Sequence, residues 1–264
     1  MKIFVIIFLL TSSFFAQSYS TRYDVNVGMF GRVGYADFTL KVNGDNYEAK
    51  LSAIMVGVAA TLTGNWVETF TSNGNIVDGK YIPQKFIKTK NTTRKSRIQT
   101  YYFDHDKKEV KLVEEKTKIV SKSRFDTTDF QICYEDVNET SHKEEVLETY
   151  IADDSLSAYL NTKLNANAKN KIYNLVAIGA HNDENNVTLS FLDGSEKESA
   201  LLNFSSDIET VYNIHVEPFD KEDKIVDVLV AFDKDGYMKE ALLGEVFWIG
   251  KITADRVDQN IAIK

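Results

Sequence analysis

Cysteine and proline are scarce in this chain of 264 residues. It has one cysteine, Cys133, and two prolines, Pro83 and Pro218. A single thiol excludes an internal disulfide, so the stability of the fold must come from a packed core. Cys133 is either an inert thiol or the site of a bridge to another molecule. No proline-rich or low-complexity segment divides the chain, so we interpret it as one domain.

Long apolar runs are missing except at the N-terminus. The segment "IFVIIFLL" (3–10) follows Lys2 and precedes the small residues of "TSSFFAQSYS" (11–20). This order is typical of a cleavable secretory signal peptide, and the run is too short to span a bilayer. We therefore expect a periplasmic protein whose mature part has no transmembrane segment.

Small residues suit the −3 and −1 positions of signal cleavage at two places, after Ser18 and after Ser20. We place the end of the signal peptide at Ser20. Residues 21–264 are then a single β-rich domain.

Positive charge is the minority sign, with 31 Lys and Arg against 39 Asp and Glu and a net charge of −8. This acidic balance argues against nucleic acid as a partner.

Sequence motifs of known catalytic sites are missing as well. The chain has no Gly-x-Ser-x-Gly, no His-Glu-x-x-His, no glycine-rich phosphate loop and no cysteine pair. His105 and His181 stand in acidic clusters that we interpret as solvated turns, and "FDKDG" (232–236) fits a β-turn better than a calcium loop. His215 could meet the acidic residues that follow it, but nothing requires this. We expect no catalytic residue, no metal and no cofactor.

Apolar residues at period 2, the spacing of half-buried β-strands, are abundant. Residues 36–42 and 47–55 alternate in this way on either side of "NGDN" (43–46), where Asn-Gly favours a hairpin. Turn residues at 72–75 and 233–236 separate further runs. The other predicted strands are 22–29, 65–71, 80–90, 95–104, 109–120, 129–135, 172–178, 186–192, 209–217, 224–232 and 245–253.

Three segments depart from this alternation. "VGVAATLTG" (56–64) is either a short helix or a bent strand, and the acidic stretch 136–150 is interpreted as a mobile loop. "IADDSLSAYLNTKL" (151–164) predicts an amphipathic helix, because Asp153 or Asp154 can cap its N-terminus and the leucines that follow share one face. We expect this helix to cover a sheet. The predicted fold class is mainly β, an antiparallel curved sheet or open or half barrel with one or two short helices.

Three stretches resemble an exported bacterial family, domain of unknown function 3108 (DUF3108). "YDVNVGMFGRVGYADFTLKV" (23–42) is similar to its opening strands, and residues 77–110 are similar to its middle hairpin. "DDSLSAYLNTKL" (153–164) is similar to its Asp-x-Leu-Ser helix. The resemblance implies an exported, β-rich fold without an assigned activity, and it assigns no functional residue.

Two groups of residues are candidates for binding. A curved sheet under a helix can enclose an apolar cavity, whose predicted lining is Phe38, Leu40, Leu51, Tyr159 and Leu160. Six cations crowd one predicted hairpin of an otherwise acidic chain. They form either a solvated edge, or a contact surface for anionic lipid or an acidic partner. These basic residues are Lys85, Lys88, Lys90, Arg94, Lys95 and Arg97.

Two asparagines are candidates for glycosylation. Asn138 and Asn186 each begin an Asn-x-Thr acceptor with an acidic residue two positions before, as in certain bacterial N-glycosylation systems.

Three functions remain open. The first is a periplasmic protein that binds an amphiphilic or lipid-like ligand at the cell envelope. The second is a non-enzymatic assembly or protein-interaction module of the envelope. An enzyme of unfamiliar type ranks last.

Overall fold

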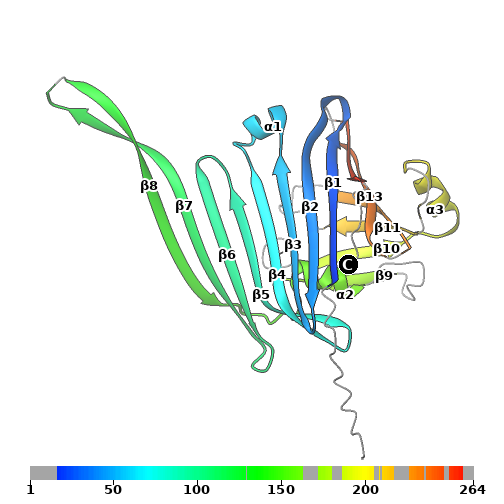
Figure 1. Cartoon of the computed structure of the whole chain (residues 1–264). Coiled ribbons are helices and arrows are strands. Elements are labelled where there is room, and N and C mark those ends of the chain that lie inside the picture. Colours follow the sequence, from blue (N-terminus) through cyan, green and yellow to red (C-terminus); the bar gives the residue numbers. More distant parts are fainter. Residues whose placement is uncertain are drawn as a thin grey trace, which may run out of the picture.

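Fourteen strands form one antiparallel sheet in the computed structural model of the chain (Figure 1). The structure describes residues 17–128, 130–162, 172–179, 186–204, 208, 210–216, 226–234, 236–246 and 250–257. The strand order is β8-β7-β6-β5-β4-β3-β2-β1-β14-β13-β12-β11-β10-β9, so the sheet is not closed into a barrel. The predicted fold class, a mainly β antiparallel curved sheet or open or half barrel, is confirmed, but the described part of the chain has four short helices where one or two were predicted.

The first eight strands form one meander and the last six form another. The strands are β1 (Gln17–Val27), β2 (Gly31–Asn43), β3 (Asn46–Met55), β4 (Val67–Val77), β5 (Lys80–Asn91), β6 (Lys95–Asp104), β7 (Glu109–Asp126), β8 (Gln131–Val146), β9 (Ile172–Val176), β10 (Asn186–Phe191), β11 (Thr210–Val216), β12 (Val226–Phe232), β13 (Met238–Val246) and β14 (Gly250–Val257). The helices are the 3₁₀ helix η1 (Gly28–Phe30), α1 (Gly57–Leu62), α2 (Ser155–Thr162) and α3 (Gly194–Leu201). None of the helices in the described part of the chain has the length and hydropathy of a transmembrane span.

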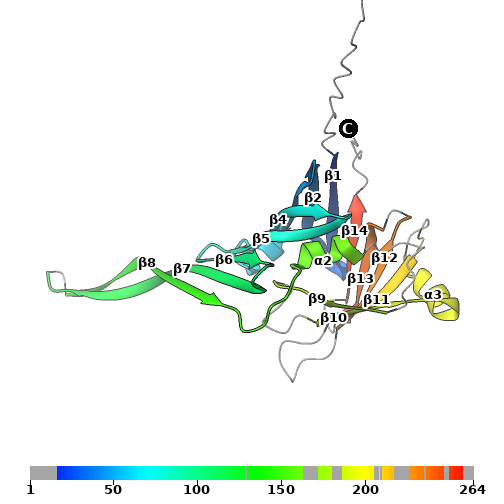
Figure 2. The same ribbon diagram turned by 90° about the horizontal axis from the view of Figure 1, so that it is seen from below.

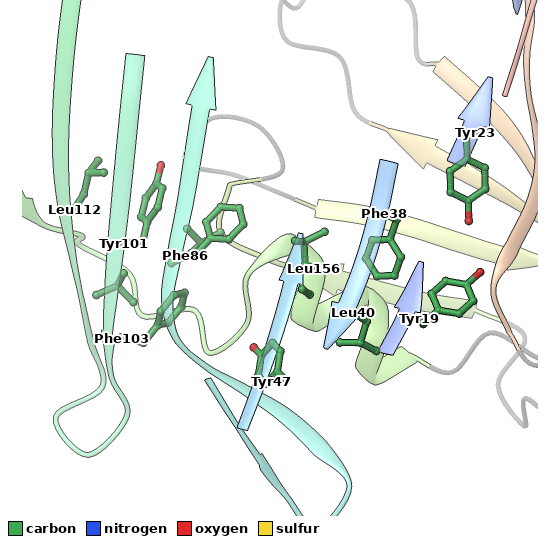
Figure 3. Packing of buried hydrophobic residues seen from close by; sticks show 13 residues of the cluster. Tyr19, Tyr23, Phe38, Leu40, Tyr47, Phe86, Tyr101, Phe103, Leu112 and Leu156 are labelled. Atoms are coloured by element: carbon green, nitrogen blue, oxygen red, sulfur yellow. The ribbon is translucent and has the colours of Figure 1, made fainter. Parts of the chain in front are cut away.

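The two meanders are joined where β1 pairs with β14, at opposite ends of the sequence. The sheet curls around α2, which lies on its inner face and contacts β3, β4, β5 and β9 (Figure 2). The main core fills the space between α2 and the first meander, and Figure 3 shows its aromatic and leucine side chains. A second core cluster, formed by Leu189, Tyr212, Val230 and Phe232, belongs to the other meander.

Helix α2 is tied to the sheet by buried hydrogen bonds, which explains the unusual stretch 151–164. The Asp154 carboxylate caps α2 by accepting from the backbone N–H groups of Leu156 (2.8 Å) and Ser157 (3.0 Å). Ser157 Oγ accepts from the Asp154 N–H at 2.9 Å, which completes a reciprocal cap. Asn161 both donates to and accepts from the backbone of Tyr81 on β5. The Asp-x-Leu-Ser pattern therefore serves to fix the helix on the sheet.

Two predictions of local structure were wrong for the first meander. Residues 72–75 lie inside β4, where the register shifts between Asn73 and Gly74, and the turn comes later, at Asp78–Gly79. The stretch 136–150 is largely strand β8 instead of a mobile loop. Its polar sequence is ordered by cross-strand ion pairs such as Lys118–Glu139 (2.9 Å) and Lys111–Glu144 (2.6 Å), which need no apolar face.

Other boundaries also differ from the predictions. Residues 56–64 contain helix α1, which settles the choice between a helix and a bent strand. The predicted strand 245–253 runs across the connection between β13 and β14, and the rest of β13 was missed. Helix α3 was not predicted, because its polar sequence has no apolar stripe. Gly236 has a φ of 81°, as the predicted turn at 233–236 requires.

Candidate functional site

Basic side chains gather on the inner face of the sheet, beside the main core. Side chains two positions apart on a strand lie on the same face of the sheet. Each basic residue is an even number of positions from a buried residue of its own strand, which is Phe86 on β5, Tyr101 on β6 or Leu112 on β7. We call this group the cationic band. It consists of Lys88, Lys90, Lys95, Arg97, Lys116 and Lys118.

The register of the three strands brings like charges side by side. Lys90 is paired with Arg97, and Arg97 is paired in turn with Lys116, so three cations form one row across β5, β6 and β7. Lys95 and Lys118 are paired in a second row. Like charges directly opposite each other in a sheet destabilise it, by a few tenths of a kcal/mol to about 1 kcal/mol for each pair. An arrangement of this kind is stabilised when an anion is bound to it.

Three carboxylates neutralise part of the band. Glu114, whose side chain is only 7% exposed, lies between Arg97 and Lys116, with its oxygens 2.5 Å from Arg97 Nε and 2.5 Å from Lys116 Nζ. Burial raises the pKa of Glu114, but the hydrogen bonds and charges of these two cations outweigh it and hold the pKa below its usual value. Glu68 pairs with Lys88, and Glu139 pairs with Lys118. The six cations of the band and these three carboxylates together carry a net charge of 6 − 3 = +3.

The band remains open to solvent. Lys90 and Lys95 are exposed, and no hydrogen bond or ion pair of their side-chain nitrogens occurs within the described part of the chain. Arg97 and Lys116 are each about half exposed. Four basic groups on two neighbouring rows can therefore reach a bound phosphate or carboxylate without first breaking the fold.

The predicted basic hairpin is divided between the two faces of the sheet. Lys90, Lys95 and Arg97 lie on the inner face, as does Lys88, whose side chain is 18% exposed and packs over the Phe70 ring. Lys85 lies over the Tyr102 ring on the outer face. Arg94 binds Asp136 and Ser121, also on the outer face. The expectation of one surface of six cations was therefore wrong.

Lys116 and Lys118 were missed by the sequence interpretation, although they belong to the band. They alternate along the predicted strand 109–120, and only the register of β6 with β7 shows that they lie beside Arg97 and Lys95. The sequence does contain a signal for them. The two lysines are two positions apart, and the turn at 104–109 between the two predicted strands sets the register that brings them opposite Arg97 and Lys95.

The predicted apolar lining is part of the packed core. Phe38 and Leu40 are buried, and Leu51, Tyr159 and Leu160 pack against the same cluster. The Phe38 ring meets the Tyr159 ring edge-on at 6.1 Å between centroids. These contacts favour a structural role for the five side chains. An open hollow of about 440 Å³ lies elsewhere, against α3, and is lined by Leu192, Ser195, Glu196, Ser199, Ala200, Asn203 and Leu229.

The histidines play local roles where the structure describes them. His105 was predicted in a solvated turn, but it is partly buried and contacts the Tyr150 hydroxyl (2.7 Å) and the Pro83 carbonyl oxygen (2.6 Å). It thus ties the β6–β7 turn to β5. His215 contacts Asp227 at 2.8 Å on the neighbouring strand. His181 lies outside the described residues.

The two candidate acceptor asparagines lie in strands. Asn138 is exposed on β8, opposite Ile119, and not in the loop that was predicted for it. Asn186 begins β10. Their glycosylation stays a prediction, which the masses of the two peptides from native protein will test.

Comparisons with known proteins add little to this geometry. No protein-family model matches the chain, and no curated protein matches it significantly. The chain is similar to a solved structure described as a "Beta-barrel-like Protein of Domain of Unknown Function DUF1849 from Brucella abortus". The TM-score is 0.42 and the identity 12%, over 92% of this chain and 99% of that chain. The resemblance to domain 3108 stays a prediction.

Proposed function

We propose that the protein binds an anionic group, a phosphate or carboxylate of the kind carried by envelope lipids, on the cationic band. The observation that carries the proposal is the row of Lys90, Arg97 and Lys116, three cations on adjacent strands of a protein with a net charge of −8. An anion bound beside this row offsets the repulsion that Glu114 leaves, and the N–H groups of Arg97 that Glu114 does not engage can donate hydrogen bonds to it. A periplasmic location, expected from the signal peptide, would place the band near such lipids.

Calorimetric titration of the mature protein with lysophosphatidylglycerol below its micelle concentration tests the proposal. Binding should weaken at least roughly tenfold in Arg97→Glu, since the lost basic residue contributes about 1 kcal/mol and the new carboxylate also repels the anionic lipid. Lys85→Glu is the matched control, because it reverses a charge on the outer face. Equal binding of zwitterionic lysophosphatidylcholine, or equal loss in the control, would contradict the proposal. Inorganic phosphate in place of the lipid shows whether the anion alone is sufficient.

The alternative is a protein-interaction module. One observation favours it: β8 is an edge strand of 16 residues, so one row of its backbone N–H and C=O groups is open to a partner strand. This function would be favoured if the protein binds no lipid but captures a partner protein, and if the variant Thr140→Pro in β8 no longer captures that partner.

A further inference from the structure

One end of the first meander carries exposed apolar side chains. In an antiparallel meander every second connection lies at the same end, so η1, α1, and the tip of the β7–β8 hairpin share one edge. Figure 1 shows this edge at the top of the view, where the β7–β8 arm reaches beyond the neighbouring strands. We call the apolar side chains on this edge the apical rim. It consists of Phe30, Val58, Leu62, Phe125, Phe130, Ile132 and Tyr134.

The tip of the arm is the largest part of the rim. Phe125 is paired with Ile132, and Phe130 and Tyr134 share their face of the hairpin, so the four side chains form one patch. The Phe125 and Phe130 rings meet edge-on at 6.2 Å. Phe130 is 79% exposed and Tyr134 is 76% exposed. A two-stranded arm has no second layer that could cover this patch.

Helix α1 and η1 present the same kind of surface. Leu62 at the end of α1 is 82% exposed, Val58 is 74% exposed, and α1 has no buried residue. Phe30 in η1 is 63% exposed. The rim thus holds seven of the fourteen exposed large hydrophobic side chains in the described part of the chain. Such a concentration marks a surface that contacts something apolar.

We propose that the apical rim inserts into the head-group region of a lipid bilayer. A bilayer can receive apolar protrusions from three separate turns, whereas a folded partner would need a matching pocket for each. Lys95 of the cationic band begins β6 at this same end, and its side chain is exposed. Lys122 and Arg124 lie behind the aromatic patch, on the opposite face of the arm, where Lys122 pairs with Glu139 at 3.1 Å. Aromatic side chains beside basic ones are typical of membrane-interface anchors.

Co-sedimentation with vesicles of phosphatidylglycerol and phosphatidylcholine in equal amounts tests the proposal. We expect the double variant Phe130→Ser/Ile132→Ser to lose at least roughly tenfold in affinity, and Leu62→Ser to lose less, because the first removes two large apolar side chains from the contact and the second removes one. Leu202→Ser is the matched control, because Leu202 is 89% exposed but lies after α3, outside the rim. All four substituted residues are exposed, so circular dichroism should show folded variants.

The single cysteine provides a second measurement. Cys133 is exposed within the tip, so an environment-sensitive fluorophore attached there should shift to the blue when vesicles are added. The same label on a Cys133→Ser/Val77→Cys variant, at the other end of β4, should not shift. The proposal is overturned if the wild-type protein does not sediment with the vesicles, or if the Leu202 variant and the rim variants bind the vesicles equally. It is also overturned if the rim substitutions abolish self-association of the protein instead of vesicle binding.

The inference does not rest on the proposed anion site, because the seven rim residues are not part of the band. The two can therefore fail separately. Loss of vesicle binding in the rim variants with unchanged binding of lysophosphatidylglycerol supports membrane docking alone. If Arg97→Glu abolishes both kinds of binding while the rim variants abolish neither, the band is the lipid contact and the docking proposal is wrong.

Discussion

Ser72 on β4 donates a hydrogen bond of 2.5 Å to the carboxylate of Asp154, the capping residue of α2. Both side chains are fully buried, and the Tyr47 hydroxyl contacts Ser72 Oγ at 2.9 Å. The helix is therefore held on the sheet by a polar chain inside an apolar core. Leaving any of these groups without its partner would cost about 1–3 kcal/mol. The contact joins segments 82 residues apart in the sequence.

The buried carboxyl group makes the stability depend on pH. Burial raises the pKa of Asp154 to about 6, although hydrogen bonds from Ser72, Ser157 and Leu156 lower it. An unfolded aspartate titrates near 3.9, so between about pH 4 and pH 6 the folded state keeps a proton that the unfolded state releases. The contribution of Asp154 to the free energy of unfolding should therefore fall as the pH rises, by about 3 kcal/mol in all.

Urea unfolding of wild type and Asp154→Asn across this pH range measures the effect. The wild type should lose stability relative to the variant as the pH rises from about 4 to about 7, because asparagine does not titrate. Tyr47→Phe is the control, since it removes one hydrogen bond of the same chain without removing the carboxyl group. A difference between wild type and Asp154→Asn that stays constant with pH would contradict the prediction.

Gly179 should tolerate no side chain. Its φ is +85°, and a Cβ built on it would lie 2.2 Å from Cε1 of the buried Phe86 ring. Alanine there combines left-handed strain with overpacking, and we expect Gly179→Ala to lower the free energy of unfolding by roughly 3 kcal/mol. Gly57→Ala separates the two causes, because Gly57 has a φ of +60° and nothing within 4 Å of the added Cβ. It should cost only about 1 kcal/mol. Equal losses in denaturant unfolding would show that the contact with Phe86 is unimportant.

Local sequence patterns predicted much of the first meander. The hairpin of β2 and β3 was predicted from Asn-Gly at 43–44, and α2 from its capping aspartate and apolar spacing. The predictions failed where order comes from distant contacts. Residues 136–146 of the arm strand β8 have no apolar face, and the pairing partner β7 decides their structure through ion pairs. The bulge at Asn73 and Gly74 could not be predicted from the local sequence either, because it depends on how closely the backbone of β5 approaches Gly74.

The candidate site was predicted only in part, for a related reason. A run of basic residues is visible in the sequence, but the face on which each one lies depends on the turn and on the register. Arg94 lies in the turn and reaches Asp136 on the outer face, whereas Arg97 points to Glu114 on the inner face. The pairing of Lys116 with Arg97 depends on the alignment of β6 and β7, which the turn between the two strands sets and which the alternation within either strand alone does not show.

Glu114 should limit the affinity of the band for anions. It is the buried carboxylate between Arg97 and Lys116, so Glu114→Gln adds one net positive charge where the two cations meet. We expect tighter binding of lysophosphatidylglycerol, by a few-fold to roughly tenfold, and stronger weakening of that binding by salt. Glu144→Gln is the control, because Glu144 pairs with Lys111 on the outer face and its loss should leave the binding unchanged. Weaker binding in Glu114→Gln would contradict the assignment of the band.

If the predicted signal peptide is cleaved, the fold distinguishes between the two predicted cleavage sites. Tyr19 is 8% exposed, and its ring stacks on Tyr237 at 4.0 Å between centroids, which ties β1 to the second meander. Cleavage after Ser20 would remove this side chain, whereas cleavage after Ser18 would keep it. Burial of a tyrosine ring is worth about 1.5–3 kcal/mol, so we now expect the mature chain to begin at Tyr19.

N-terminal sequencing and the intact mass of the protein purified from its native host distinguish the two sites, and an uncleaved chain would contradict the predicted signal peptide. A chain that begins at Tyr19 agrees with the contact to Tyr237, and a chain that begins at Thr21 would show that the fold does without it. Tyr237→Ala provides an independent check, because it removes the stacking partner without altering the cleavage region. If Tyr19 is retained, this variant should lower the free energy of unfolding by about 1 kcal/mol or more, since an aromatic pair contributes about 0.5–1.5 kcal/mol beyond the area that it buries.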